Sequence, residues 1–116
     1  MTDSLLELRD ALRRFAAERD WDQFHSPRNL AAALSVEAAE LLEPFQWLTD
    51  EQSRDLSPEA RAAVEQELAD VLLYLVRLAD KLDVDLASAA RAKIARNAVK
   101  YPVEKARGSS RKYDEI

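Results

Sequence analysis

The sequence predicts an all-α protein, and three of its features favour this fold class. Its 116 residues include a single glycine, whereas alanine and leucine are abundant. Alanine and leucine favour helices, and a sheet with many tight turns would need more glycine. Apolar residues also recur at three- and four-residue spacing over long stretches, which is the period of an amphipathic helix. We therefore expect one small helical domain over residues 1–104, followed by a flexible basic tail over residues 105–116.

The first two of four expected helices lie in the N-terminal half. One covers about residues 4–19 and ends before an aromatic connector, residues 21–25. The next begins at Pro27, because Ser26 can cap a helix and proline suits the first helical position. Pro44 should end or kink this helix, with one further turn after it.

The other two helices follow a polar segment, residues 49–56, which is predicted to be a loop. The third helix covers residues 58–82 and begins with the same serine–proline pair. The fourth covers residues 86–100, and Pro102 prevents its continuation. The tail then contains the only glycine, two serines and several cations.

Composition excludes several classes of function. The formal net charge of −5 argues against binding to polymeric nucleic acid, which needs a basic surface. No cysteine is present, so disulfides are excluded, and a reducing compartment is compatible with the sequence. No stretch of about 18 apolar residues suggests a membrane span, and the N-terminus lacks the apolar segment of a secretory signal. We expect a cytoplasmic protein with no membrane partner.

Two pairs of acidic residues lie in or beside apolar helix faces. Glu37 falls inside the leucine stripe of residues 27–48, and Glu40 lies at its edge. Glu67 and Asp70 repeat the spacing beside the leucines of the third helix. Four converging carboxylates cannot all stay ionised without a cation, and oxygen ligands suit Mg²⁺ or Mn²⁺. Such a site can support the hydrolysis of a phosphoanhydride.

Spacing alone leaves a second interpretation open. Most acids three residues apart on helices are solvated or paired with lysine and arginine, so the four acids could form an ordinary charged surface. The sequence argues against a di-iron carboxylate bundle, because such a bundle needs two Glu-x-x-His motifs. The only histidine, His25, lies outside both acid pairs.

Aromatic residues border the acid-bearing helices. Trp21, His25 and Trp47 flank the second helix, and Tyr74 lies one turn beyond the second acid pair. Aromatic faces stack well on nucleobases, which favours a nucleotide ligand. The alternative is that these rings belong to the core or to an interface. On the fourth helix, Lys93 and Asn97 could contact phosphate or sugar oxygens, or simply form a solvated face.

The two acid pairs, Glu37-x-x-Glu40 and Glu67-x-x-Asp70, resemble the ExxE…ExxD signature of the all-α nucleoside triphosphate pyrophosphohydrolases, the MazG-like group. Within this group the chain is most similar to the dCTP pyrophosphatase branch. The resemblance covers nearly the whole chain and is carried by RDWDQFHSPRNL, EAAELLEPFQW, EQELADVLLYL and KIARNAVKYPVEKARGSSRKY.

This resemblance implies a four-helix bundle of the MazG-like type, assembled as a homodimer or homotetramer. The active site would lie in the bundle, with a contribution from a neighbouring subunit. The implied reaction is Mg²⁺-dependent hydrolysis of a nucleoside triphosphate, dCTP or a modified dCTP, between its α- and β-phosphates. The products are the monophosphate and pyrophosphate, and the implied role is cleansing of the nucleotide pool.

The resemblance also implies a role for each candidate residue. Metal binding falls to the four acids: Glu37, Glu40, Glu67 and Asp70. The base would be surrounded by Trp21, His25 and Trp47. Sugar and phosphate contacts would come from Tyr74, Lys93 and Asn97. We choose Glu40 to orient the attacking water, although any of the four acids could do so.

Two alternatives to this function stay open. The substrate could be dUTP or a damaged or methylated nucleotide, because stacking tolerates many bases. The chain could also be a non-catalytic helical oligomerisation module. One departure from the family pattern is Val36, which stands where many MazG-like chains have a glutamate before the first ligand. It agrees with the dCTP branch and leaves the number of metal ions open.

Overall fold

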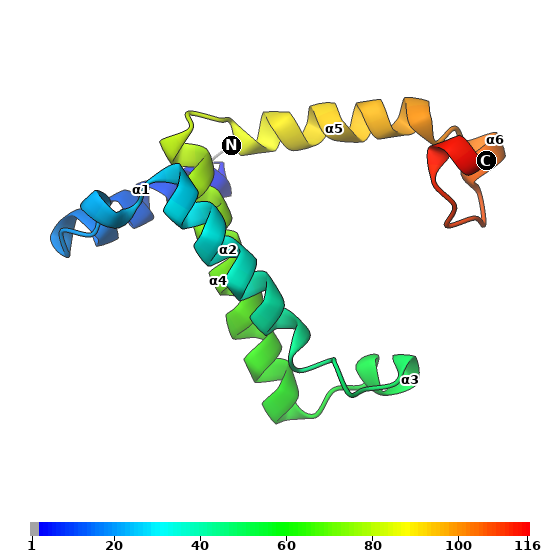
Figure 1. Ribbon diagram of the computed structural model, residues 1–116, viewed down its shortest axis with the longest axis horizontal. Helices are drawn as coiled ribbons and strands as arrows, with labels where there is room; N and C mark the ends of the chain where they lie inside the picture. Colours follow the sequence, from blue (N-terminus) through cyan, green and yellow to red (C-terminus); the bar gives the residue numbers. More distant parts are fainter. Residues whose placement is uncertain (1–2) are drawn as a thin grey trace. The chain divides into compact units, whose positions relative to one another are not determined.

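The computed structural model describes residues 3–116, and every regular element in this range is a helix (Figure 1). The prediction of an all-α fold is confirmed. Contacts group the chain into two compact units, which divide at Val84 and Asp85. Within residues 3–116, no helix combines the length and the hydrophobicity of a transmembrane segment.

The first unit is built on three long helices. These and two short elements are α1 (Ser4–Glu18), the 3₁₀ helix η1 (Asp22–Phe24), α2 (Pro27–Leu42), α3 (Asp50–Ser53) and α4 (Pro58–Lys81). Helix α2 runs along α4, and α1 packs against α4 as well (Figure 1). Helix α4 is therefore the central element of this unit, because both α2 and α1 pack against it.

The serine–proline starts behave as the sequence predicts. The hydroxyl of Ser26 accepts a hydrogen bond from the backbone N–H of Asn29 at 3.1 Å, at the start of α2. The hydroxyl of Ser57 accepts one from Ala60 at 3.2 Å, at the start of α4. Each hydroxyl satisfies a backbone donor that has no partner within its helix. These two caps fix where the acid-bearing helices begin.

The predicted loop over residues 49–56 is wrong for Asp50–Ser53, which form α3. Thr49 caps this helical turn through its hydroxyl, which accepts a hydrogen bond from the N–H of Gln52 at 3.1 Å. The side chain of Gln52 in turn accepts one from the N–H of Thr49 at 3.0 Å. This reciprocal capping box stabilises a short helix in a segment whose polarity alone suggested a loop.

The second unit consists of α5 (Leu86–Lys100), α6 (Val103–Ala106) and the 3₁₀ helix η2 (Tyr113–Glu115). The carboxylate of Asp85 caps α5 by accepting a hydrogen bond from the N–H of Ser88 at 3.0 Å. Near its end, the rings of Tyr101 and Tyr113 pack edge to face with their centroids 6.2 Å apart. The predicted domain boundary at residue 104 and the flexibility of the tail stay predictions.

The hydrophobic core is small for a chain of this length. Its buried apolar residues are Ala16, Leu30, Val64, Val76 and Ala79. The leucine-rich face predicted for the third helix is divided in the structure. Val64 and Ala79 are buried, whereas Leu68 and Leu82 are 52% and 54% exposed. Part of this apolar face is therefore uncovered on the single chain, and its burial would need a further surface.

Candidate functional site

Carboxylates from two helices converge between α2 and α4. Glu37 and Glu40 project from α2, and Glu67 and Asp70 project from α4; we call these four residues the acid cluster. One carboxylate oxygen each from Glu37, Glu67 and Asp70 lie within 4.8 Å of one another. The close packing of the two helices brings Glu37 to residues that lie 30 and 33 positions later in the sequence.

The acid cluster is electrostatically strained. Burial and the neighbouring carboxylates of Glu40, Asp70 and Glu67 together raise the pKa of Glu37 to about 7, and burial is the largest cause. Buried oxygens of Glu37 and Glu67 have no hydrogen-bond partner among the described residues. No ion pair within residues 3–116 involves a member of the cluster. A buried acceptor without a partner is costly, so this arrangement calls for a positive group from outside the chain.

A divalent cation fits this donor set. Carboxylate oxygens are the preferred ligands of Mg²⁺ and Mn²⁺, and softer metals would favour nitrogen or sulfur ligands that the cluster lacks. A bound cation would also use the two unpartnered oxygens of Glu37 and Glu67. The carboxylates of Glu37, Glu67 and Asp70 are those that could bind one ion together, and Glu40 borders them.

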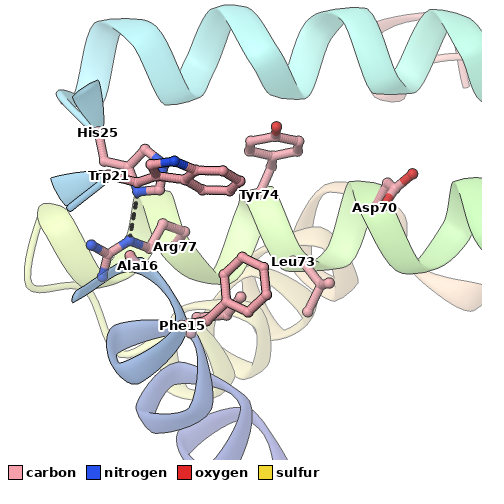
Figure 2. Close-up of a pocket in the computed structure, with 9 residues that line it drawn as sticks. Phe15, Ala16, Trp21, His25, Asp70, Leu73, Tyr74 and Arg77 are labelled. Atoms are coloured by element: carbon pink, nitrogen blue, oxygen red, sulfur yellow. Dashed lines mark hydrogen bonds between the residues drawn. The ribbon is translucent and has the colours of Figure 1, made fainter. Parts of the chain in front are cut away.

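A cavity of about 260 Å³ lies next to the acid cluster, and Asp70 belongs to both (Figure 2). Three of the aromatic candidates from the sequence line it: Trp21, His25 and Tyr74. The rest of the lining is mostly apolar and comes from α1 and α4: Leu12, Phe15, Ala16 and Leu73, together with Arg77. The volume lies just below the usual range for small-ligand pockets, which begins at about 300 Å³. An apolar, aromatic cavity beside a carboxylate cluster suits a ligand with a flat ring and a charged group.

The turn after α1 places Trp21 at this cavity. Asp20 adopts a left-handed conformation with φ of 53°, which aspartate tolerates better than most residues. The N–H of Trp21 donates to the carbonyl of Ala16 at 2.9 Å, and the N–H of Asp20 donates to Ala17 at 3.2 Å. This Schellman pattern ends α1 and reverses the chain. The indole then packs edge to face against Phe15, with ring centroids 5.6 Å apart.

A second charged group, which sequence reasoning missed, lies at the far end of the cavity. The side chain of Arg77 is buried, with only 6% of the residue exposed. Its Nε donates to Nδ1 of His25 at 3.1 Å, and its Nη2 donates to Asp22 at 2.5 Å. Its Nη1 lies 3.5 Å from a carboxylate oxygen of Asp80. Arg77 therefore links the connector after α1 to the last turns of α4.

Two further cationic side chains, Arg13 and Lys81, pair with the acids around Arg77. Arg13 donates to Asp80 at 2.8 and 2.5 Å, and Lys81 forms an ion pair with Asp22. We call Arg13, Asp22, Arg77, Asp80 and Lys81 the ion-pair network. The hydrogen bond from Arg13 lowers the pKa of Asp80, and the one from Lys81 lowers the pKa of Asp22. The acids of the network are thus stabilised in their charged form.

A sequence signal for Arg77 did exist. It lies three residues after Tyr74 and seven after Asp70, which puts all three on one ridge of α4. An arginine on a helix usually faces solvent, and its burial depends on Asp22 from a distant connector. The sequence alone does not reveal that contact.

Three predicted substrate-binding residues belong neither to the acid cluster nor to the lining of the cavity. Trp47 follows α2, is 87% exposed, and does not line the cavity of the first unit. Lys93 and Asn97 are exposed on α5, in the second unit. Their assignment to substrate binding stays a prediction.

The fold and the site together define a helical protein with a candidate divalent-metal centre next to an aromatic cavity. A sequence profile of the MazG-like family matches residues 32–116. Human dCTP pyrophosphatase 1 is 50% identical over 115 residues, which span 97% of this chain and 68% of the human protein. The bovine dCTP pyrophosphatase 1 is 48% identical over the same shares of both chains.

The structural comparison agrees with the sequence comparison. A pyrophosphatase of Archaeoglobus fulgidus DSM 4304, solved by crystallography, superposes with a TM-score of 0.82. It is 39% identical, and the match covers 88% of this chain and 95% of that one. The chain belongs to the MazG-like family.

Proposed function

We propose that this chain is a metal-dependent nucleotide pyrophosphohydrolase that cleaves dCTP, or a modified dCTP, between its α- and β-phosphates. The products would be the nucleoside monophosphate and pyrophosphate, and the role would be cleansing of the nucleotide pool. The convergence of Glu37, Glu67 and Asp70, with no cationic partner among the described residues, carries the proposal. Relatives that share half of the sequence and are named dCTP pyrophosphatase 1 support the substrate class.

The acid cluster would bind the cation, which we expect to be Mg²⁺, with Mn²⁺ as an alternative. When bound, a divalent ion polarises phosphoryl oxygens and lowers the pKa of a bound water. Glu37, Glu67 and Asp70 would fix the position of the ion. Glu40 is half-buried beside Glu37, and we assign it the orientation of the attacking water. Its carboxylate would accept a hydrogen bond from that water.

The cavity would hold the base. Trp21 offers an aromatic face for stacking, and Tyr74 lies between the cavity and the acid cluster, where a deoxyribose would fit (Figure 2). His25 would face the polar edge of the base. A volume of about 260 Å³ suits a base better than a whole nucleotide, so the triphosphate would extend past Asp70 to the metal. In this scheme, stacking on the aromatic rings contributes affinity for the base, and the metal site supports the hydrolysis.

The active form would be a homo-oligomer, a dimer or a tetramer, in which helices of neighbouring chains complete a four-helix bundle. The exposed leucines of α4 support this, because Leu68, Leu72 and Leu75 follow one another along the helix and are between 36% and 52% exposed. A second chain could also supply Trp47, Lys93 and Asn97 to the substrate. We also propose that residues 1–104 form the helical domain, that residues 105–116 form a flexible tail, and that the protein is cytoplasmic.

Release of pyrophosphate from dCTP in the presence of Mg²⁺ tests the proposal. We expect turnover by the wild-type chain, and a fall of about 100-fold or more in Glu37→Gln and Asp70→Asn, because a catalytic metal contributes several kcal/mol. Glu65→Gln is the matched control: it removes the same charge from α4, but Glu65 is exposed and outside the cluster. The proposal fails if no deoxynucleoside triphosphate is hydrolysed, or if Glu37→Gln keeps the wild-type rate.

A panel of nucleotides distinguishes the alternatives. Comparing kcat/KM for dCTP, dUTP and methylated dCTP ranks the substrates by preference. A non-catalytic oligomerisation module predicts instead that Mg²⁺ and nucleotides leave the melting temperature unchanged. A ligand present at 100 times its Kd should stabilise the fold by about 2.7 kcal/mol.

A further inference from the structure

The contact between Arg77 and His25 constrains where the imidazole can carry its proton. The Nε–H of Arg77 donates to Nδ1 of His25 at 3.1 Å, as the dashed line in Figure 2 shows. A guanidinium has donors only and stays protonated in proteins. Nδ1 must therefore provide a lone pair. In a neutral ring the proton then resides on Nε2.

The guanidinium itself is held in place. Asp22 accepts from its Nη2 at 2.5 Å, and Asp80 lies 3.5 Å from its Nη1. Asp80 is in turn oriented by Arg13, whose Nε donates to it at 2.8 Å. With 6% of its surface exposed, Arg77 has no room to swing away from His25. The donor to Nδ1 is part of the fold and is in place before any ligand binds.

The surroundings also keep the ring uncharged. Three charged groups act on His25: Arg77 and Lys81 from α4, and Asp22 from the connector. Burial lowers the pKa of His25, the two cations lower it further, and Asp22 opposes them. The imidazole therefore stays neutral near pH 7. An imidazolium would place an N–H of its own against the N–H of Arg77.

The other ring nitrogen is available to a ligand. Within residues 3–116, Nε2 of His25 has no hydrogen-bond partner, whereas Nδ1 is bound by Arg77. His25 lines the cavity together with Trp21 and Tyr74. An N–H at this place is a hydrogen-bond donor beside the stacking surface.

We propose that Arg77 is a positioning residue: it fixes His25 as a neutral imidazole with the proton on Nε2, so that the cavity offers a donor that matches the N3 acceptor of cytosine. The identity of the base rests on the proposed function, whereas the tautomer does not. Uracil and thymine carry a hydrogen on N3, so a fixed donor facing that atom would reject them. Arg77 thus makes the imidazole selective without touching the nucleotide itself.

The tautomer can be measured in the ligand-free protein, because His25 is the only histidine of the chain. In ¹⁵N NMR of histidine-labelled protein at pH 7, we expect a protonated Nε2 and an unprotonated Nδ1. Arg77→Met should give a mixture of tautomers and a higher pKa for His25, since it removes both the donor and a nearby positive charge. A wild-type ring protonated on Nδ1, or an Arg77→Met spectrum identical to the wild type, overturns the inference.

Two further variants keep this test decisive. Arg13→Met is the matched control, because it removes a cation from the same network but does not touch His25; the His25 spectrum should not change. In Arg77→Met, Asp22 keeps Lys81 and Asp80 keeps Arg13 as partners, which favours folding. If that variant still fails to fold, Arg77→Lys retains the charge without the rigid Nε donor. It should also mix the tautomers, and a retained wild-type tautomer would contradict the proposal.

Selectivity provides the second readout. We expect the ratio of kcat/KM for dCTP over dUTP to fall about tenfold in Arg77→Met, the value of one well-placed hydrogen bond. His25→Gln can place an amide N–H near the position of Nε2 and should keep more of this ratio than His25→Asn. The analogue 3-deaza-dCTP, which lacks the N3 acceptor, should lose about as much as dUTP. Hydrolysis with an unchanged ratio in Arg77→Met overturns the inference, whereas no hydrolysis of any nucleotide overturns the proposed function and leaves the NMR result to decide on Arg77.

Discussion

Helix α4 takes part in two charged regions that treat their acids in opposite ways. In its middle, Glu67 and Asp70 meet Glu37 from α2, and no cation from residues 3–116 pairs with them. Near its end, Asp80 lies between Arg13 and Arg77. The pKa of Glu37 is consequently raised to about 7, whereas the pKa of Asp80 is lowered.

The difference lies in the source of positive charge. In the ion-pair network, burial of a carboxylate is offset by arginine donors that belong to the same chain. In the acid cluster, buried oxygens of Glu37 and Glu67 lack any partner among the described residues. Carboxylates that two helices bring together without a cation indicate a binding site for an ion from solution. Carboxylates that pair with arginine or lysine of the same chain indicate a contribution to the stability of the fold.

A cationic side chain placed inside the acid cluster should remove the contrast between the cluster and the ion-pair network. Of the changes considered, it should have the largest effect on activity. In Glu67→Lys, the new ammonium can pair with Glu37 and Asp70, so the cluster would resemble the ion-pair network. We expect hydrolysis of dCTP to fall by about 100-fold or more, because the metal and the ammonium compete for the same carboxylates. Mg²⁺ should no longer raise the melting temperature, which a thermal shift assay measures. A Mg²⁺-induced stabilisation equal to that of the wild type would contradict this.

Weakening the ion-pair network should instead reduce stability and spare metal binding. Asp80→Asn removes the charge of a half-buried carboxylate that accepts hydrogen bonds from Arg13 and Arg77. We expect the free energy of unfolding to fall by about 2 kcal/mol, the cost of losing charge-assisted bonds at a partly buried site. Urea denaturation without metal measures this. The Mg²⁺-induced rise in melting temperature should persist, and its loss would show that the two regions are not independent.

The two regions should also respond to pH with opposite sign. Because the folded pKa of Glu37 is about 7 and its ordinary value is 4.5, the folded state binds more protons between these values. Metal-free stability should therefore fall as the pH rises from about 5 to about 8. Asp80 has a lowered pKa, so its contribution is present at neutral pH and is lost in acid.

The Glu37 contribution can be isolated by difference. His25, with a lowered pKa, contributes a slope of the opposite sign, so the comparison must be made between wild type and Glu37→Gln. The substituted chain should lose less stability between about pH 5 and about pH 8, as should the wild type in saturating Mg²⁺. Identical pH profiles for urea denaturation of the two chains would show that Glu37 titrates normally.

The smallest effect is expected at an ordinary surface pair. Arg61 and Glu65 lie one turn apart on α4 with 3.4 Å between their charged atoms, and both side chains are mostly exposed. Arg61→Gln should change the free energy of unfolding by less than about 0.5 kcal/mol. A change as large as that of Asp80→Asn in the same urea experiment would mean that burial does not set the strength of these pairs.

The long helices and the convergence of acids could be anticipated from the sequence. Ser26–Pro27 and Ser57–Pro58 mark two helix starts, and the position of Glu37 within a leucine stripe marks a half-buried carboxylate. These signals are local, because capping and helical periodicity act over a few residues. The short helix α3 was missed although its capping box, Thr49 with Gln52, is just as local.

The ion-pair network could not be anticipated, because it depends on contacts between distant segments. The buried guanidinium of Arg77 is paired with Asp22, which lies 55 residues earlier and accepts its hydrogen bond. The exposure of the leucines on α4 likewise depends on segments that are distant in the sequence. Val64 and Leu68 lie four residues apart, so helical periodicity predicts one shared apolar face, but the packing of α2 and α1 leaves Leu68 exposed. Which side of an apolar helix is covered depends on its neighbours, and the pattern does not encode them.

The most direct test of the account is to locate a divalent ion at the acid cluster. Crystals grown with Mn²⁺ and measured at its absorption edge would reveal the ion by anomalous scattering. We predict a peak within coordinating distance of carboxylate oxygens from Glu37, Glu67 and Asp70, and its loss in Glu37→Gln crystals. No anomalous density between α2 and α4, in wild-type crystals saturated with Mn²⁺, would contradict the central claim.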